Sequence, residues 1–157
     1  MSRKKLKIPG STEWNGYETD LDVRYAHKLI FGKSLDDAQE HFGGVQSISR
    51  ADELLRMPRG AFQYYVLAFA QFVTSDAACQ DADSASSFLR LLINRERRDP
   101  GSFAEIYDQL VSAMEFVAAR QEYFDASTDI YGSFADLAAE LKAADGLEDK
   151  HACKVSE

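Results

Sequence analysis

Apolar residues are densest between Ala61 and Val73, where they recur at steps of three and four positions. This spacing is the period of an α-helix. Apolar side chains cover nearly the whole circumference, with Gln63 and Gln71 as the clearly polar exceptions. A helix of this kind has to be enclosed by other elements, and it is shorter than the roughly 20 apolar residues that span a bilayer. We therefore predict a buried central helix over residues 60–75.

The segments on either side are amphipathic and predict shorter helices around the central one. Residues 17–25 also alternate like a strand, but no later segment offers a strand to pair with, so a helix from 20 to 31 is favoured. The other helices are expected at 35–42, 50–57, 84–97, 102–123 and from 134 to a stop at Asp145-Gly146. The predicted fold is all-α, a single-domain bundle of six or seven helices.

Two of these helices begin with nearly the same sequence. Residues 101–106 read Gly-Ser-Phe-Ala-Glu-Ile, and residues 132–137 read Gly-Ser-Phe-Ala-Asp-Leu. A serine followed three positions later by an acidic residue is a helix-capping pattern. The flanking sequences differ, so shared capping chemistry explains the likeness better than a duplication. We predict that Ser102 and Ser133 are N-caps, and that Ser49 caps the helix at 50–57 in the same way.

The ends of the chain differ in composition from its middle. Residues 1–16 are expected to form a flexible basic arm, anchored to the body by Trp14, the only tryptophan. Residues 17–146 form the predicted helical domain, and residues 147–157 a polar tail.

The net charge of −8 is unevenly distributed. The first seven residues carry four basic groups and no acid, which leaves −12 on residues 8–157. A body this acidic repels phosphate backbones, so nucleic acid is not expected as a partner. Solubility is the commoner reason for such a charge, but a protein partner, if there is one, is expected to be basic. No signal peptide or membrane-spanning segment is recognisable, so a cytoplasmic location is expected, with reduced thiols at Cys79 and Cys153.

Motifs for chemistry are missing from the sequence. His151 and Cys153 are the one close histidine–cysteine pair, and a structural zinc site needs four ligands, so no metal is expected. No nucleophile elbow and no glycine-rich phosphate loop is present, so no catalytic residue and no cofactor is predicted.

Charged positions offer two candidate surfaces. An acidic stripe on the predicted helix 102–123 consists of Glu105, Asp108, Glu115 and Glu122. Such a stripe is usually the solvated face of an amphipathic helix, and it is also where a basic protein would bind. A basic stripe on the helix 84–97 and just beyond it consists of Arg90, Asn94, Arg97 and Arg98; it could hold a carboxylate or phosphate, although pairing with the protein's own acids is favoured.

The alternative to a binding protein is an enzyme or small-ligand binder with a pocket beside the central helix. Its candidate residues are His27, Glu53, Tyr64 and Tyr65. Helical domains can assemble such sites from distant residues. Core packing is the competing explanation for the two tyrosines and for His27.

Three runs in the middle of the chain resemble bacterial helical proteins of unassigned function. They are Phe31-Gly32-Lys33-Ser34-Leu35-Asp36-Asp37-Ala38-Gln39-Glu40, then Met57-Pro58 with Ala61-Phe62 and Tyr64-Tyr65, then Ser75-Asp76-Ala77-Ala78. The resemblance implies a bacterial source and no particular activity.

Taken together, these patterns favour a non-catalytic protein that binds another protein. An immunity-like role against a basic toxin is one concrete form of this hypothesis. The abundance of phenylalanine and tyrosine leaves both a monomer and a homodimer open.

Overall fold

The computed structural model describes residues 6–143, and this part of the chain is helical without any strand. The longer helices are α1 (Leu21–Ile30), α3 (Gln46–Arg56), α4 (Arg59–Val73), α5 (Ala82–Arg98), α6 (Tyr107–Ala118) and α8 (Phe134–Ala143). Two helices of one turn, α2 (Leu35–Ala38) and α7 (Thr128–Tyr131), lie between them. Short 3-10 turns occur at Tyr17–Thr19, Gln39–His41, Asp76–Ala78 and Ala104–Ile106. The all-α prediction is confirmed.

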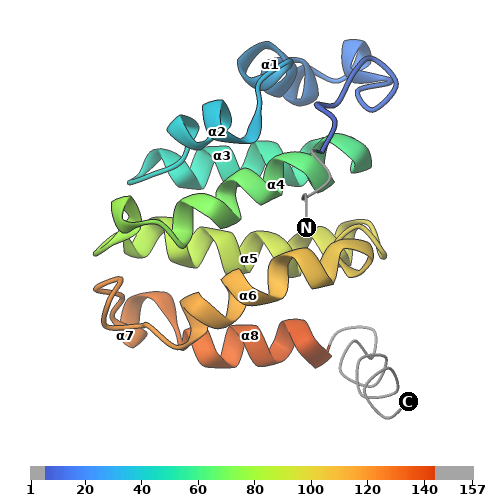
Figure 1. The fold of residues 1–157 in the computed structure, drawn as a ribbon. Helices are drawn as coiled ribbons and strands as arrows, with labels where there is room; N and C mark the ends of the chain where they lie inside the picture. The colour runs from blue at the N-terminus through green and yellow to red at the C-terminus, as the bar shows by residue number, and fades with distance from the viewer. Residues whose placement is uncertain (1–5, 144–157) are drawn as a thin grey trace, which may run out of the picture.

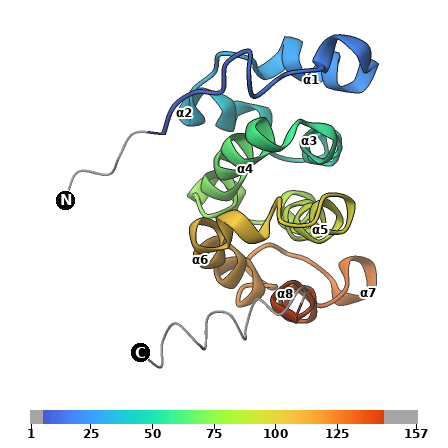
Figure 2. The ribbon, with the colours of Figure 1, turned by 90° about the vertical axis from the view of Figure 1, so that its right-hand side faces the viewer.

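The helices are arranged in two layers (Figures 1 and 2). In one layer α1 packs on α3, α3 on α5, and α5 on α8; in the other, α2 packs on α4 and α4 on α6. Contacts of α4 with α3 and α5, and of α6 with α8, join the layers. The chain thus folds as stacked pairs of helices.

Burial explains why α4 is apolar on almost every side. Phe62, Tyr65 and Phe69 are fully buried, because neighbours within its own layer and the helices of the other layer both cover it. Gln71 is the exposed residue of this helix, and its side-chain oxygen accepts a hydrogen bond from Gln39 over 2.6 Å. The helix is therefore enclosed as predicted, but α4 is one member of a layer and shares the middle of the stack with α5 (Figure 1).

Local sequence sets several of the helix starts. The side chain of Asp20 accepts hydrogen bonds from the first turn of α1, and those of Ser34 and Asp81 do the same for α2 and α5. Ser133 accepts from the backbone N–H of Asp136 over 3.2 Å, as predicted. Side-chain oxygens at these positions satisfy N–H groups that have no partner within the helix.

Some sequence predictions need correction, and others lie outside the described residues. The helix expected at 102–123 is confined to 107–118, after a 3-10 turn, and Ser102 does not cap it. Ser49 lies inside α3, which begins at Gln46, and α7 was not predicted. The stop at Asp145-Gly146 and the tail 147–157 fall outside residues 6–143.

The N-terminal segment is anchored as expected. Trp14 is fully buried, and its ring meets His27 edge-on with centroids 5.2 Å apart. Pro9 is buried as well. The anchoring role of Trp14 is confirmed, while the domain boundary at residue 16 stays a prediction.

Candidate functional surfaces

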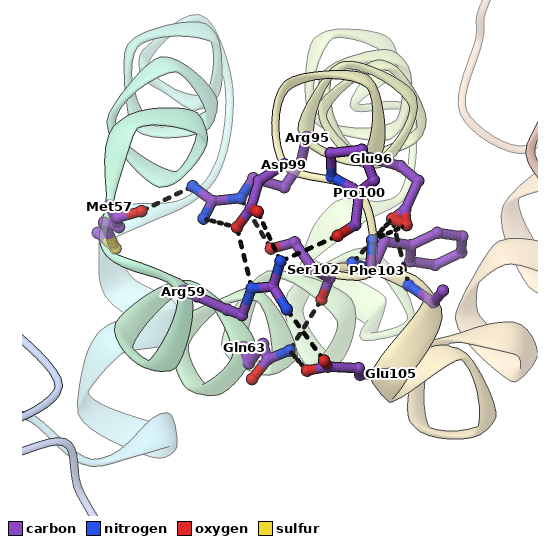
Figure 3. Close-up of polar contacts among 12 residues, drawn as sticks. Met57, Arg59, Gln63, Arg95, Glu96, Asp99, Pro100, Ser102, Phe103 and Glu105 are labelled. Carbon is purple, nitrogen blue, oxygen red and sulfur yellow. Dashed lines mark hydrogen bonds and ion pairs between the residues drawn. The ribbon is translucent and has the colours of Figure 1, made fainter.

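A network of hydrogen bonds joins the turn between α3 and α4 to the turn between α5 and α6 (Figure 3). Arg59, the first residue of α4, donates to both carboxylate oxygens of Asp99 and, over 2.9 Å, to Oε1 of Glu105. Gln63, one turn further along α4, donates to Oε2 of Glu105 over 2.8 Å. The hydrogen bonds from Arg59 are the main cause that lowers the pKa of Asp99 below its ordinary value.

Arg95 of α5 lies at the buried side of this network and is only 3% exposed. Its Nη1 donates to the carbonyl oxygens of Leu55 and Met57 over 2.8 and 2.7 Å, and its Nε donates to the hydroxyl of Ser102 over 2.9 Å. Its Nη2 lies 3.3 Å from Asp99, and the guanidinium carbon lies 4.6 Å from the centre of the Phe62 ring. Protein groups occupy all three nitrogens, so this network joins helices and offers no open face to a substrate.

Glu96 completes the network on the side of α6. It is 4% exposed, and its carboxylate accepts hydrogen bonds from the backbone N–H groups of Gly101, Phe103 and Ala104. A carboxylate from the preceding helix thus does the capping that the sequence assigned to Ser102. The Ser102 hydroxyl does not act as the cap, because it accepts a hydrogen bond from Nε of Arg95 instead.

The four acids of the predicted partner-binding stripe lie in different surroundings. Glu105 belongs to the network of Arg59, and Glu115 pairs with Lys142 of α8 over 3.4 Å. Asp108 is exposed at the start of α6 and lines an open groove between α4 and α6. Glu122 is exposed beyond the end of α6. Since α6 spans Tyr107–Ala118, only Asp108 and Glu115 of the four lie on this helix.

Two of the four predicted pocket residues meet around Trp14. The ring of His27 stacks between Tyr17 and Phe31, with centroid distances of 3.8 and 4.3 Å, and burial lowers its pKa. The ring of Tyr65 lies 6.3 Å from that of Trp14. The Tyr65 hydroxyl bonds to the carbonyl oxygens of Ile30 and Lys33, both over 3.0 Å, and burial raises its pKa to about 12. Backbone carbonyl groups are therefore the hydrogen-bond partners of the buried Tyr65 hydroxyl.

The other two pocket residues have different neighbours. Tyr64 packs edge-on against Tyr65 and is 8% exposed. Glu53 lies on α3, where it pairs with Arg50 over 3.1 Å, and partial burial raises its pKa. Glu53 lines a groove on the layer of α1, α3 and α5, whereas Tyr64 and Tyr65 belong to the layer of α4.

The α4–α6 groove is an open depression on the layer of α2, α4 and α6, with a volume of about 790 Å³. Apolar side chains of Leu67, Ala70 and Phe116 form much of its floor. Asp108 is the charged residue among those that line it. Leu6, from the N-terminal segment, also contributes to the lining.

The α1–α3–α5 groove is a second open depression, of about 700 Å³, on the other layer. Exposed Tyr25 of α1 and Ile48 of α3 line one part of it, and Arg90 and Asn94 of α5 line another. Its lining is more polar than that of the α4–α6 groove and carries charges of both signs.

Sequence reasoning missed the residues that build the network. Arg95 stands in a polar run, Arg-Glu-Arg-Arg, that reads as the solvated end of a helix, and it is buried. The spacing of Arg95 and Asp99, at i and i+4, was the available signal for a pair. Nothing in the sequence marked Arg59 as the partner of Asp99, because the two come from different helices. Tyr25 and Ile48 carried no signal for a groove.

Among residues 6–143, no group of three or more histidine, cysteine or acidic side chains is placed to hold a metal ion. None of the helices in this range has the length and apolar character needed to cross a membrane. The chain matches no protein-family model, no curated protein and no solved structure.

Proposed function

We propose that this protein acts by binding another protein in the α4–α6 groove, and that it catalyses no reaction of its own. One observation carries the proposal: the groove is open, measures about 790 Å³, and combines an apolar floor with a single acidic residue, Asp108, in its lining. Open apolar depressions rimmed by polar groups mark interaction sites on proteins of this size.

The partner should be basic, and it should dock through apolar side chains next to a lysine or arginine. Leu67, Ala70 and Phe116 would receive the apolar side chains, and Asp108 would attract the basic one. The charge of −12 on residues 8–157 would raise the rate of encounter with such a partner. Inhibition of a basic toxin by an immunity-like protein is a concrete case of this chemistry.

Affinity purification from the native host, at low and at high salt, tests the proposal. Asp108→Lys and Ser112→Lys place a positive charge in the groove, and Asp129→Lys, on the exposed turn α7, makes the same change of charge as Asp108→Lys elsewhere. The partner should be retained by the wild type and by Asp129→Lys, and lost from both groove variants and at high salt.

Two results would contradict the proposal. Recovery of no partner at low salt would count against protein binding as a whole. Equal retention by Asp108→Lys and the wild type would place the partner elsewhere on the surface.

A further inference from the structure

We infer that the α1–α3–α5 groove is a second binding surface, which takes an extended polypeptide segment that carries a carboxylate. The inference rests on Arg90 and its surroundings and is independent of the α4–α6 groove. Together the two surfaces would let one small protein bridge two partners of opposite charge.

Arg90 is the cation of this groove that has no acidic partner within the described residues. Its Nε donates to the hydroxyl of Ser86 over 3.3 Å, and its Nη2 donates to the carbonyl oxygen of Tyr131 over 2.8 Å. Both acceptors are neutral, so they hold the guanidinium in place without cancelling its charge. The residue is exposed, and an arginine fixed in this way is prepared for a carboxylate.

The acids of the groove are already paired with other arginines. Glu53 pairs with Arg50, and both Asp52 and Asp22 lie within 3.5 Å of Arg56. Two arginines face three acids here, so the α1 and α3 side of the groove carries one net negative charge, and each of its acids is paired with an arginine. The positive charge at the α5 side is left without such compensation, although the protein as a whole is acidic.

Polar groups suited to a peptide flank Arg90 on the same helix. Asn94, one turn further along α5, is exposed and lines the groove, and Ser87 lines it on the preceding turn. An asparagine amide can donate to a carboxylate or backbone carbonyl and accept from a backbone N–H. The α5 side of the groove can therefore bind both a carboxylate and the main chain beside it.

The opposite side of the groove offers apolar contacts. Tyr25 and Ile48 are 51% and 53% exposed, which is unusual for side chains of this size in one depression. Helices that pack in a layer are about 8–10 Å apart, so α1 and α5 are separated by roughly 16–20 Å. An extended chain rises about 3.3 Å per residue, so about five or six residues would join an apolar side chain at Tyr25 to a carboxylate at Arg90.

The carboxylate can come from an aspartate or glutamate side chain or from the end of a chain. Two random 12-residue peptide libraries distinguish these sources when both are selected on the full-length protein. In one the peptides are internal to the displayed protein, and in the other they end in a free carboxylate. Enriched peptides are then synthesised with a fluorescent label, and their binding is measured by fluorescence anisotropy.

The matched variants are Arg90→Glu and Arg98→Glu. Arg98 lies at the end of the same helix, is exposed and does not line the groove, so its substitution makes the same change of charge outside the site. Enriched peptides should place an apolar residue five or six positions from a carboxylate. Arg90→Glu should weaken their binding at least tenfold, and Arg98→Glu should change it less than twofold.

The inference fails if neither library yields binders, or if the enriched peptides lack a carboxylate at this spacing. It also fails if Arg90→Glu binds them as tightly as the wild type. Circular dichroism melting of both variants separates a loss of binding from a loss of folding. Ile48→Ser provides a second check, because it should weaken binding several-fold without changing any charge.

Discussion

Arg59 and Asp99 stand 40 positions apart in the chain, and both oxygens of the Asp99 carboxylate accept hydrogen bonds from the Arg59 guanidinium. Arg59 opens α4, and Asp99 directly follows α5. Paired hydrogen bonds of this kind fix both distance and orientation. The pair therefore joins the start of α4 to the end of α5. Arg95 reinforces this contact from the buried side, where its Nη2 lies beside Asp99 (Figure 3).

Asp99→Asn should destabilise the protein by about 1–3 kcal/mol, between the values typical of exposed and of buried pairs. The side chain of Asp99 is 35% exposed, but that of its partner Arg95 is 4% exposed and would keep a charge with no acid beside it. Urea unfolding measures the change. Asp129→Asn, on exposed α7, is the matched control and should shift stability by less than about 0.5 kcal/mol. Equal effects of the two substitutions would contradict this role for Asp99.

Acid should weaken the same contact. The pKa of Asp99 is lowered from its ordinary value of 3.8, so the folded protein holds the proton less tightly than the unfolded chain. The stabilisation is complete above about pH 4 and is lost as the pH falls through the lower, folded pKa. Urea unfolding from pH 6 to pH 2.5 should show the wild type and Asp99→Asn converging in stability at the acidic end. A constant difference across this range would be inconsistent with the lowered pKa.

Ser102→Ala should cost more stability than Ser133→Ala, although the two serines stand in nearly identical sequences. Ser133→Ala removes an exposed cap, at about 0.5–1 kcal/mol. Ser102→Ala leaves the buried Nε of Arg95 without its acceptor, at about 1–3 kcal/mol. Thermal and urea unfolding of both variants gives the comparison. The reverse order would show that Ser102 acts as an ordinary cap after all.

Trp14→Ala should destabilise the protein by about 3–5 kcal/mol, the range for removal of a large buried aromatic side chain. Trp14 is fully buried against rings from α1 and α4, so its loss opens a cavity and releases the N-terminal segment. Tyr25→Ala, at an exposed position on α1, serves as the control and should cost less than about 0.5 kcal/mol. In the wild type, the fluorescence of this single tryptophan should shift to the red on unfolding.

The sequence was a reliable guide to what depends on neighbouring residues. The apolar period of α4, the helical choice at residues 20–31 and the capping role of Ser133 could all be read from a few adjacent positions. Helix formation and capping are local, because their hydrogen bonds join residues three or four positions apart. The burial of Trp14 followed from its size and apolar character.

The functional surfaces were much less predictable. Glu105 and Asp108 looked equivalent in the sequence, but Arg59 pairs with the first and the second lines a groove. Arg90 and Arg97 also looked alike, and only Arg97 meets an acid, Glu140 of α8. These outcomes depend on which helices become neighbours, and no pattern within one helix contains that information.

By itself, the sequence determined that the protein is helical, that its body is acidic, and that one apolar helix has to be covered. The tertiary structure alone decided that the helices stack in two layers, that Ser102 gives up its capping role to Glu96, and that each layer keeps an open groove. The physical reason is one of range. Periodicity and capping act within a turn or two of helix, whereas ion pairs, buried hydrogen bonds and grooves arise between segments some 40 positions apart.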